Sequence, residues 1–180
     1  MDEFSRRAPR GENIRTARFE FAYMAARRTG ERKPPPRAET LIAEYRAAIE
    51  ALAAKGKLVI GGKSMGGRVA SMLADELFAD RQITGLVCLG YPFHPPGSPG
   101  KLRTAHLETL TTPTLVCQGS RDPFGTKEEV AAYRLSPEIE LHWLEDGDHD
   151  FRPRKASGLT ARGNLDAATT RSGIEGLPNA

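Results

Sequence analysis

Three continuous apolar runs of strand length constrain this chain more than any other feature of its sequence. They are Leu58–Ile60, Leu86–Leu89 and Thr114–Cys117. A strand that is apolar at every position, rather than at alternate ones, is typical of a parallel sheet that helices cover on both faces. With their flanks and two less uniform segments, the expected strands are Arg18–Ala22, Leu58–Gly61, Ile83–Leu89, Pro113–Gln118 and Ile139–Leu144.

Helical patterns fall between these strands. Apolar residues recur at helical spacing over Leu41–Leu52 and again over Val69–Phe78. Gly56 is expected as the C′ glycine that ends the first of these helices. A third helix is expected over Thr126–Arg134, because its first residue and Glu129 form a capping box. Strands that alternate with helices predict βαβ units and an α/β fold with a mostly parallel sheet.

The chain is long enough for one globular domain but not for two. Its 180 residues are 39% hydrophobic and 27% charged, an ordinary balance for a globular protein. We expect one domain over 1–155, with loops over Thr29–Arg37 and the proline-rich Tyr91–Lys101. Residues 156–180 have weak periodicity, so a weakly structured tail is expected there. No targeting segment and no membrane-length apolar run is visible, which predicts a cytoplasmic protein.

Charge and cysteine content point away from several other classes of protein. The net charge of +3 is small and does not indicate a nucleic-acid partner. The basic residues around the proline triplet are Arg27, Arg28, Arg32, Lys33 and Arg37. They have no aromatic residues between them, so a solvated loop explains them more simply than nucleic-acid binding. Cys88 and Cys117 lie inside apolar runs and are expected to be buried free thiols.

A candidate nucleophile follows the strand expected at Leu58–Gly61. The segment Gly62-Lys63-Ser64-Met65-Gly66 matches the pattern G-x-S-x-G between that strand and a helix. This context predicts a nucleophile elbow, a sharp turn that lifts the Ser64 hydroxyl above the sheet. The two outer glycines would relieve crowding in the turn, and Gly67 would let the helix pack closely. The alternatives are a glycine-rich turn without chemistry and a phosphate loop, which lacks the first glycine that the pattern G-x-x-x-x-G-K-[ST] requires.

Asp122 and His149 lie just past the fourth and fifth expected strands. With Ser64 they stand in the chain order Ser, Asp, His, which is the order found in α/β hydrolases. Parallel strands bring their carboxyl ends to one edge, so Asp122 would orient His149 and His149 would take the proton of Ser64. Separately, Asp122 could be an Asx-turn residue and His149 a surface histidine.

The acidic residues and histidines near these positions raise the question of a metal site. His142, Asp146, Asp148, His149 and Asp150 could be read as a metal cluster, but no spacing among them matches a ligand motif, so no metal and no cofactor are expected.

Lys63, Arg121 and His94 would bring positive charge to the rim around Ser64. Such charge would favour a small acyl substrate that is anionic. In the alternative, these side chains pair with Asp146, Asp148 and Asp150 or face water.

Four stretches together resemble a known family. They are 62–68, the proline loop 89–97, Gln118–Gly125 and Asp146–Phe151. They are similar to a small α/β-hydrolase family related to dienelactone hydrolases, whose eukaryotic relatives include testis-expressed protein 30 and subunit 3 of the NSL chromatin complex. The resemblance covers about residues 17–155. It implies an α/β-hydrolase fold with Ser64, Asp122 and His149 as the triad.

The ends of the chain depart from that family. Its members carry a strand and a glycine-containing loop upstream of the region matched by Arg18–Ala22, and Met1–Thr16 shows neither. The fold is therefore expected to lack its first strands, with the Met65 N–H as the visible oxyanion donor. Two functions follow as hypotheses. One is a serine hydrolase of esters or thioesters, and the other is a non-catalytic interaction domain or scaffold on the same fold.

Overall fold

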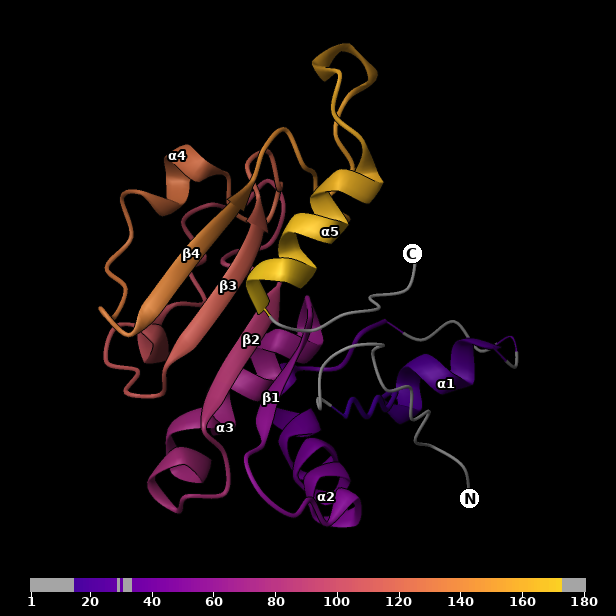
Figure 1. Ribbon diagram of the computed structural model, residues 1–180, viewed down its shortest axis with the longest axis vertical. Coiled ribbons are helices and arrows are strands. Elements are labelled where there is room, and N and C mark those ends of the chain that lie inside the picture. Colours follow the sequence, from indigo (N-terminus) through magenta and orange to yellow (C-terminus); the bar gives the residue numbers. More distant parts are fainter. Residues whose placement is uncertain (1–14, 29, 31–33, 173–180) are drawn as a thin grey trace. The chain divides into compact units, whose positions relative to one another are not determined.

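A computed structural model describes residues 15–28, 30 and 34–172 (Figure 1). The chain divides into two compact units, one running to Gly56 and one starting at Lys57. The boundary falls inside the range 1–155 that was predicted as one domain. No described helix is long and apolar enough to cross a membrane.

The first unit is helical in its described part, with α1 at Ala22–Arg28, a 3-10 helix at Ala38–Leu41 and α2 at Ile42–Leu52. The strand predicted at Arg18–Ala22 is wrong, because Ala22 begins a helix. Its N–H donates to Glu44 over 2.6 Å, and the N–H groups of the following turn bond to the carbonyl of Phe21. The alternating pattern comes from two aromatic rings, Phe19 and Phe21, that pack against Tyr45 with centroids 5.1 and 6.2 Å away.

The end of α2 also differs from the prediction. Ala53, at φ 45°, takes the left-handed position after the helix, and its N–H bonds to the carbonyl of Glu50. Gly56 has φ +100° but lies beyond this cap. The glycine therefore serves the turn that follows the helix, and not the helix terminus itself.

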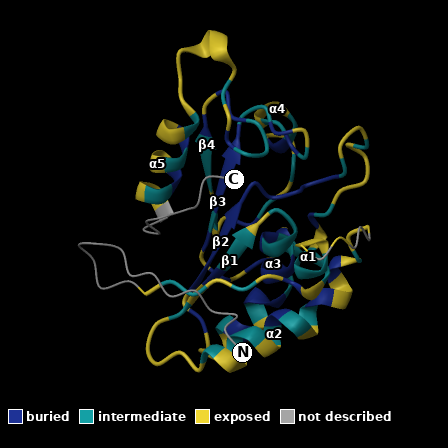
Figure 2. Ribbon diagram, turned by 90° about the vertical axis from the view of Figure 1, so that its right-hand side faces the viewer, coloured by how far each residue is buried: buried dark blue, intermediate teal, exposed yellow. Residues whose placement is uncertain are grey.

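The second unit is built on a four-stranded sheet, β1 at Val59–Lys63, β2 at Gly85–Leu89, β3 at Thr114–Gly119 and β4 at Ile139–Leu144. The strands are parallel and ordered β1-β2-β3-β4 (Figure 1). This confirms the parallel sheet, with every strand boundary within two residues of the expected one and β4 matching at both ends. All five residues of β2 are buried, as a continuous apolar run predicts (Figure 2).

Helices cover both faces of this sheet. α3 runs over Met65–Ala79 and α5 over Ala161–Ser172. Cys88 of β2 lies under Gly67 of α3, while its neighbours Val87 and Leu89 belong to a core cluster that includes Ala168 of α5. Because successive side chains of a strand point to opposite faces, α3 and α5 cover opposite faces of the sheet.

The helix α5 corrects the weakly structured tail predicted for 156–180, of which residues 173–180 lie outside the described part. α5 is mostly polar and its apolar face is narrow, so its periodicity is weak in the sequence. Tertiary contacts hold it instead. Ala168 packs on the core, and the buried Asn164 donates to the carbonyls of Glu145 and Phe151 over 3.1 and 2.9 Å.

Three smaller features complete the unit. α4 is only Lys127–Val130, shorter than the helix predicted through Arg134, although both hydrogen bonds of its capping box are present. The segment 91–101 contains no helix or strand, as predicted, and 3-10 turns occur at Ala105–Leu107 and Lys155–Ser157. Cys88 and Cys117 are buried free thiols, which confirms the prediction; burial raises the pKa of both.

Candidate active site

Ser64 stands alone between β1 and α3, in a strained turn. Its φ is +52°, a left-handed value that residues with a side chain rarely adopt. The turn is held from both sides, because the Ser64 N–H donates to the carbonyl of Leu89 on β2 and its carbonyl accepts from Arg68 of α3. The hydroxyl does not cap its own helix, so it is available to a partner outside the turn.

The glycines of the motif differ in what they provide. A Cβ on Gly62 would lie 2.6 Å from the carbonyl carbon of Gly66, and one on Gly67 would lie 2.7 Å from the oxygen of Gly62. Both positions therefore require glycine for space, as predicted. A Cβ on Gly66 would meet nothing within 4 Å, so the prediction that this glycine relieves crowding is wrong.

A continuous chain of hydrogen bonds joins Ser64, His149 and Asp122. The Ser64 Oγ lies 2.9 Å from His149 Nε2, and His149 Nδ1 lies 2.8 Å from Asp122 Oδ2. The three residues come from loops after β1, β3 and β4, which end at the same edge of the parallel sheet. The His149 side chain is 21% exposed and that of Asp122 is 0% exposed. A buried acid thus faces a histidine that reaches solvent, with a serine hydroxyl at its other nitrogen.

The surroundings of Asp122 explain how its carboxylate stays buried. Oδ1 accepts from the Phe124 N–H over 2.9 Å, so Asp122 does form an Asx turn. Oδ2 accepts from His149 and from the side-chain amide of Gln118, also at 2.9 Å. The Phe124 ring lies 4.4 Å from the His149 ring and shields the pair. The Asx-turn reading and the orienting reading of Asp122 are therefore compatible, since each uses a different oxygen.

Gln118 is a functional candidate that the sequence analysis missed. It is the last residue but one of β3, and in the sequence it closes an apolar run. The available signal was a long polar side chain at an interior strand position, four residues before Asp122.

The loop that carries His149 is anchored to the end of β1, the strand that directly precedes Ser64. The Lys63 ammonium donates to the carbonyl of His149 over 3.0 Å and to the carboxylate of Asp150 over 2.7 Å. This hydrogen bond and charge from Lys63 lower the pKa of Asp150. On the other side, a Cβ on Gly90 would lie 3.1 Å from the oxygen of His149. The backbone around His149 is thus held by an ion pair and by close packing.

The other two residues named as substrate-binding, Arg121 and His94, have internal partners as well. Arg121 pairs with Asp146 at 2.8 Å, and Asp146 also binds Arg154. Hydrogen bonding from Arg154 lowers the pKa of Asp146 to about 2. His94 is 2% exposed and its ring contacts the carbonyl of Pro95 and the carboxylate of Glu129.

For Lys63 and Arg121 the structure matches the alternative in which these cations pair with nearby carboxylates, here those of Asp150 and Asp146. Asp148 is a turn former, since its Oδ1 accepts from the N–H groups of Asp150 and Arg152. Of the basic residues that were considered for nucleic-acid binding, Arg32 and Lys33 lie outside the described residues.

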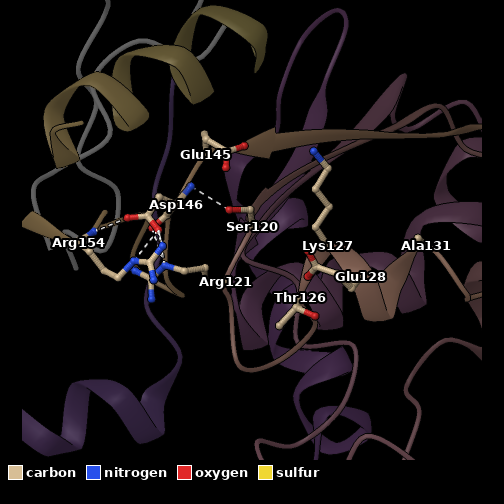
Figure 3. Close-up of a pocket in the computed structure, with 9 residues that line it drawn as sticks. All are labelled: Ser120, Arg121, Thr126, Lys127, Glu128, Ala131, Glu145, Asp146 and Arg154. Carbon is tan, nitrogen blue, oxygen red and sulfur yellow. Dashed lines mark hydrogen bonds and ion pairs between the residues drawn. The ribbon is translucent and has the colours of Figure 1, made fainter. Parts of the chain in front are cut away.

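Arg121 lines a hollow of about 640 Å³ between the loops after β3 and β4 (Figure 3). Its lining is Ser120, Arg121, Thr126, Lys127, Glu128, Ala131, Glu145, Asp146 and Arg154. Three cations and three anions are among these residues, and Figure 3 shows Asp146 between the two arginines. Ser64 and His149 do not line this hollow, so it is not a cleft over the serine.

The last features of the site are its possible oxyanion donors and its possible metal ligands. Met65 is the first residue of α3, so its N–H has no partner one turn earlier in the helix and lies next to Ser64. In the family that the sequence resembles, the glycine-containing loop that supplies a second oxyanion donor precedes the region matched by Arg18–Ala22. In this chain that upstream region includes residues 1–14, which lie outside the described part. Among the described residues, no group of three or more His, Cys, Asp or Glu side chains is placed to hold a metal ion.

Comparison with known proteins gives a family and a fold. A family model described as "Alpha/beta hydrolase domain" matches residues 1–174. Among solved structures, the chain is similar to an α/β serine hydrolase homologue from Coxiella burnetii, with 15% identity and a TM-score of 0.56. The match covers 81% of this chain and 64% of that one.

Two other solved structures are also similar to this chain. An α/β serine hydrolase without a lid from Xanthomonas campestris has 19% identity and a TM-score of 0.53, covering 81% of this chain and 62% of that one. A thermophilic esterase from Thermogutta terrifontis, solved with malate bound, has 19% identity and a TM-score of 0.51, covering 81% and 76%. The chain thus spans less than two thirds of the first and second of these three structures.

Proposed function

Because the chain belongs to the Alpha/beta hydrolase domain family, we propose that it is a serine hydrolase of small acyl compounds with Ser64, His149 and Asp122 as its triad. The observation that carries this proposal is the hydrogen-bond chain from the Ser64 hydroxyl through His149 to the buried Asp122. Fold alone would not support an activity. A strained serine that points its hydroxyl at a histidine ring, itself held by a buried carboxylate, is the arrangement that activates a hydroxyl nucleophile.

In the first half-reaction, Ser64 Oγ forms a bond to the carbonyl carbon of an ester or thioester. His149 Nε2 takes the hydroxyl proton, and the carbonyl π electrons move onto oxygen. The Met65 N–H donates to that oxyanion. When the carbonyl re-forms, the bond to the leaving alcohol or thiol breaks, and His149 returns its proton to that group.

The second half-reaction repeats these steps with water. His149 accepts a proton from water as the oxygen attacks the acyl carbon, and then protonates Ser64 Oγ as the acid leaves. Asp122 keeps the proton of the neutral ring on Nδ1, so that Nε2 is free to act as the base.

The triad is tested by covalent labelling with a fluorophosphonate. Ser64 Oγ would bond to phosphorus, fluoride would leave and the hydroxyl proton would pass to His149. Intact mass should show one adduct on the native protein and none on Ser64→Ala. Equal labelling of both proteins would remove Ser64 as the nucleophile. A folded native protein that takes no label would favour the alternative, a non-catalytic interaction domain.

Three finer points stay predictions. Kinship with dienelactone hydrolases and their eukaryotic relatives rests on the sequence motifs alone. A cytoplasmic location rests on the expectation, from the sequence, of no targeting segment. An anionic substrate is the third. It is tested with two matched esters, one neutral and one with a distal carboxylate. A higher kcat/KM for the anionic ester that shrinks with added salt would support it. The pairing of Lys63 with Asp150 and of Arg121 with Asp146 weighs against it.

A further inference from the structure

We propose that Gln118 is a positioning residue that holds the Asp122 carboxylate in line with His149, an inference that rests on the proposed hydrolase function. Gln118 is 0% exposed at the end of β3. Its amide nitrogen lies 2.9 Å from Asp122 Oδ2, the same oxygen that faces His149 Nδ1 at 2.8 Å. Gln118 therefore shares an acceptor atom with the histidine.

The orientation of this amide follows from its neighbours. Besides Asp122, its nitrogen lies 3.2 Å from the carbonyl oxygen of Tyr91 and 3.3 Å from that of Gly125. All three neighbours are acceptors, so only the NH₂ end of the amide can face them. The amide ties together β3, the start of the proline loop and the end of the turn that contains Asp122.

The other end of the same amide is left without a partner. Gln118 Oε1 is buried and accepts no hydrogen bond from any described residue. An unpaired buried acceptor is costly, and an apolar side chain at this position would avoid that cost. A glutamine here therefore destabilises its own strand end, and its compensation is the set of hydrogen bonds that its nitrogen donates.

The donation to Asp122 has a consequence for proton transfer. When His149 takes the proton of Ser64, the ring becomes a cation that needs the Asp122 charge close to Nδ1. With Phe124 on Oδ1 and Gln118 on Oδ2, the carboxylate cannot rotate about its Cβ–Cγ bond without losing a donor. Removing Gln118 leaves His149 as the single described donor to Oδ2.

The test uses Gln118→Met, which has a similar length but no donor. The rate of fluorophosphonate labelling is measured against probe concentration, so that the maximal rate kinact is separated from the binding constant KI. We expect kinact to fall about 10- to 100-fold, the range expected for losing a hydrogen bond to a charged group, with KI unchanged. A loss confined to KI, or no loss in a folded variant, would overturn the inference.

A second variant keeps the test decisive if Gln118→Met does not fold. In Gln118→Glu, a protonated carboxyl can still donate to Asp122, whereas an ionised one places a second negative charge beside it. The titratable side chain bonded to position 118 is that of Asp122, and Asp122 is in turn bonded to His149. The ratio of variant to wild-type kinact should therefore fall as the pH rises. A ratio that does not change with pH would contradict a donor role for this residue.

Two controls separate the possible failures. Thr114→Val, at the other end of β3, removes a buried hydroxyl that donates to the carbonyl of Thr112 over 2.8 Å. It should lower stability and leave kinact unchanged. Wild type and Ser64→Ala are run in parallel. If wild type does not label at Ser64, the proposed function and this inference both fail. If wild type labels and Gln118→Met matches it, this inference alone fails.

Discussion

Replacing Gly119 with alanine should move His149 out of line without changing any residue of the proposed triad. Gly119 ends β3, and its added Cβ would lie 2.3 Å from the carbonyl oxygen of Asp148 and 2.5 Å from that of Gly147. Ordinary contacts of a Cβ lie at 3.4–4 Å. Both clashing atoms belong to backbone, so no side chain can rotate to make room.

The size of the effect follows from these distances. Relieving the closer clash requires a backbone shift of about 1 Å, because repulsion rises steeply inside van der Waals contact. Asp148 directly precedes His149, so the ring moves with it relative to Ser64 and Asp122. A misplacement of about 1 Å can cost about 10²-fold in rate. Overpacking of this kind also destabilises a protein by about 1–3 kcal/mol.

The assay measures kinact for fluorophosphonate labelling together with urea unfolding of the same sample. Gly100→Ala is the matched control, since its Cβ would meet nothing within 4 Å. We expect about 10²-fold slower labelling for Gly119→Ala and no change for the control. A folded Gly119→Ala protein that labels at the wild-type rate would refute the link between this close approach and the position of His149.

Three further predictions concern ion pairs and a helix cap. The Asp146 carboxyl has a pKa of about 2, mainly through its hydrogen bond from Arg154, so its stabilisation is present above pH ~4 and is lost as the pH falls through 2. Asp146→Asn should therefore lower the unfolding free energy at pH 6, and urea curves should show the difference from wild type vanishing towards pH 2. Lys63→Met should cost no more than ~1 kcal/mol in urea unfolding at pH 7, because its pair with Asp150 is exposed, and should slow labelling of Ser64. Thr126→Ala should lower the unfolding free energy by ~1 kcal/mol in the same assay, because it removes the hydroxyl that accepts from the Glu129 N–H in the capping box of α4.

The parallel sheet and the turn around Ser64 could be predicted from the sequence because both depend on local patterns. A run such as 86–89 is apolar at every position. Its side chains can all leave water only in a strand whose two faces are both covered. The elbow needs a strand, a serine between glycines and a helix, all within about 20 residues. Ser64, Asp122 and His149 each follow one of these strands, so all three lie at one edge of the sheet, because parallel strands end at the same edge.

The partners of the charged side chains were decided by the tertiary structure. Lys63 next to Ser64 and Arg121 next to Asp122 suggest a positive rim when only the order of residues is known. The loops after β3 and β4 instead bring Asp146 and Asp150 within 2.8 Å of these cations. Coulomb energy depends on distance in space, and loop geometry sets that distance over separations of 25 residues or more along the chain.

Tertiary contacts also determined the structure of segments whose sequence pattern is weak or misleading. α5 is held by Ala168 and Asn164 against the sheet, although its own periodicity is poor. Phe19 and Phe21 alternate like a strand but pack on Tyr45. Gln118 looks like the end of an apolar run until β3 places its amide beside Asp122. Local pattern determines which elements can form, whereas packing and buried hydrogen bonds select among them, because these terms arise only when distant segments meet.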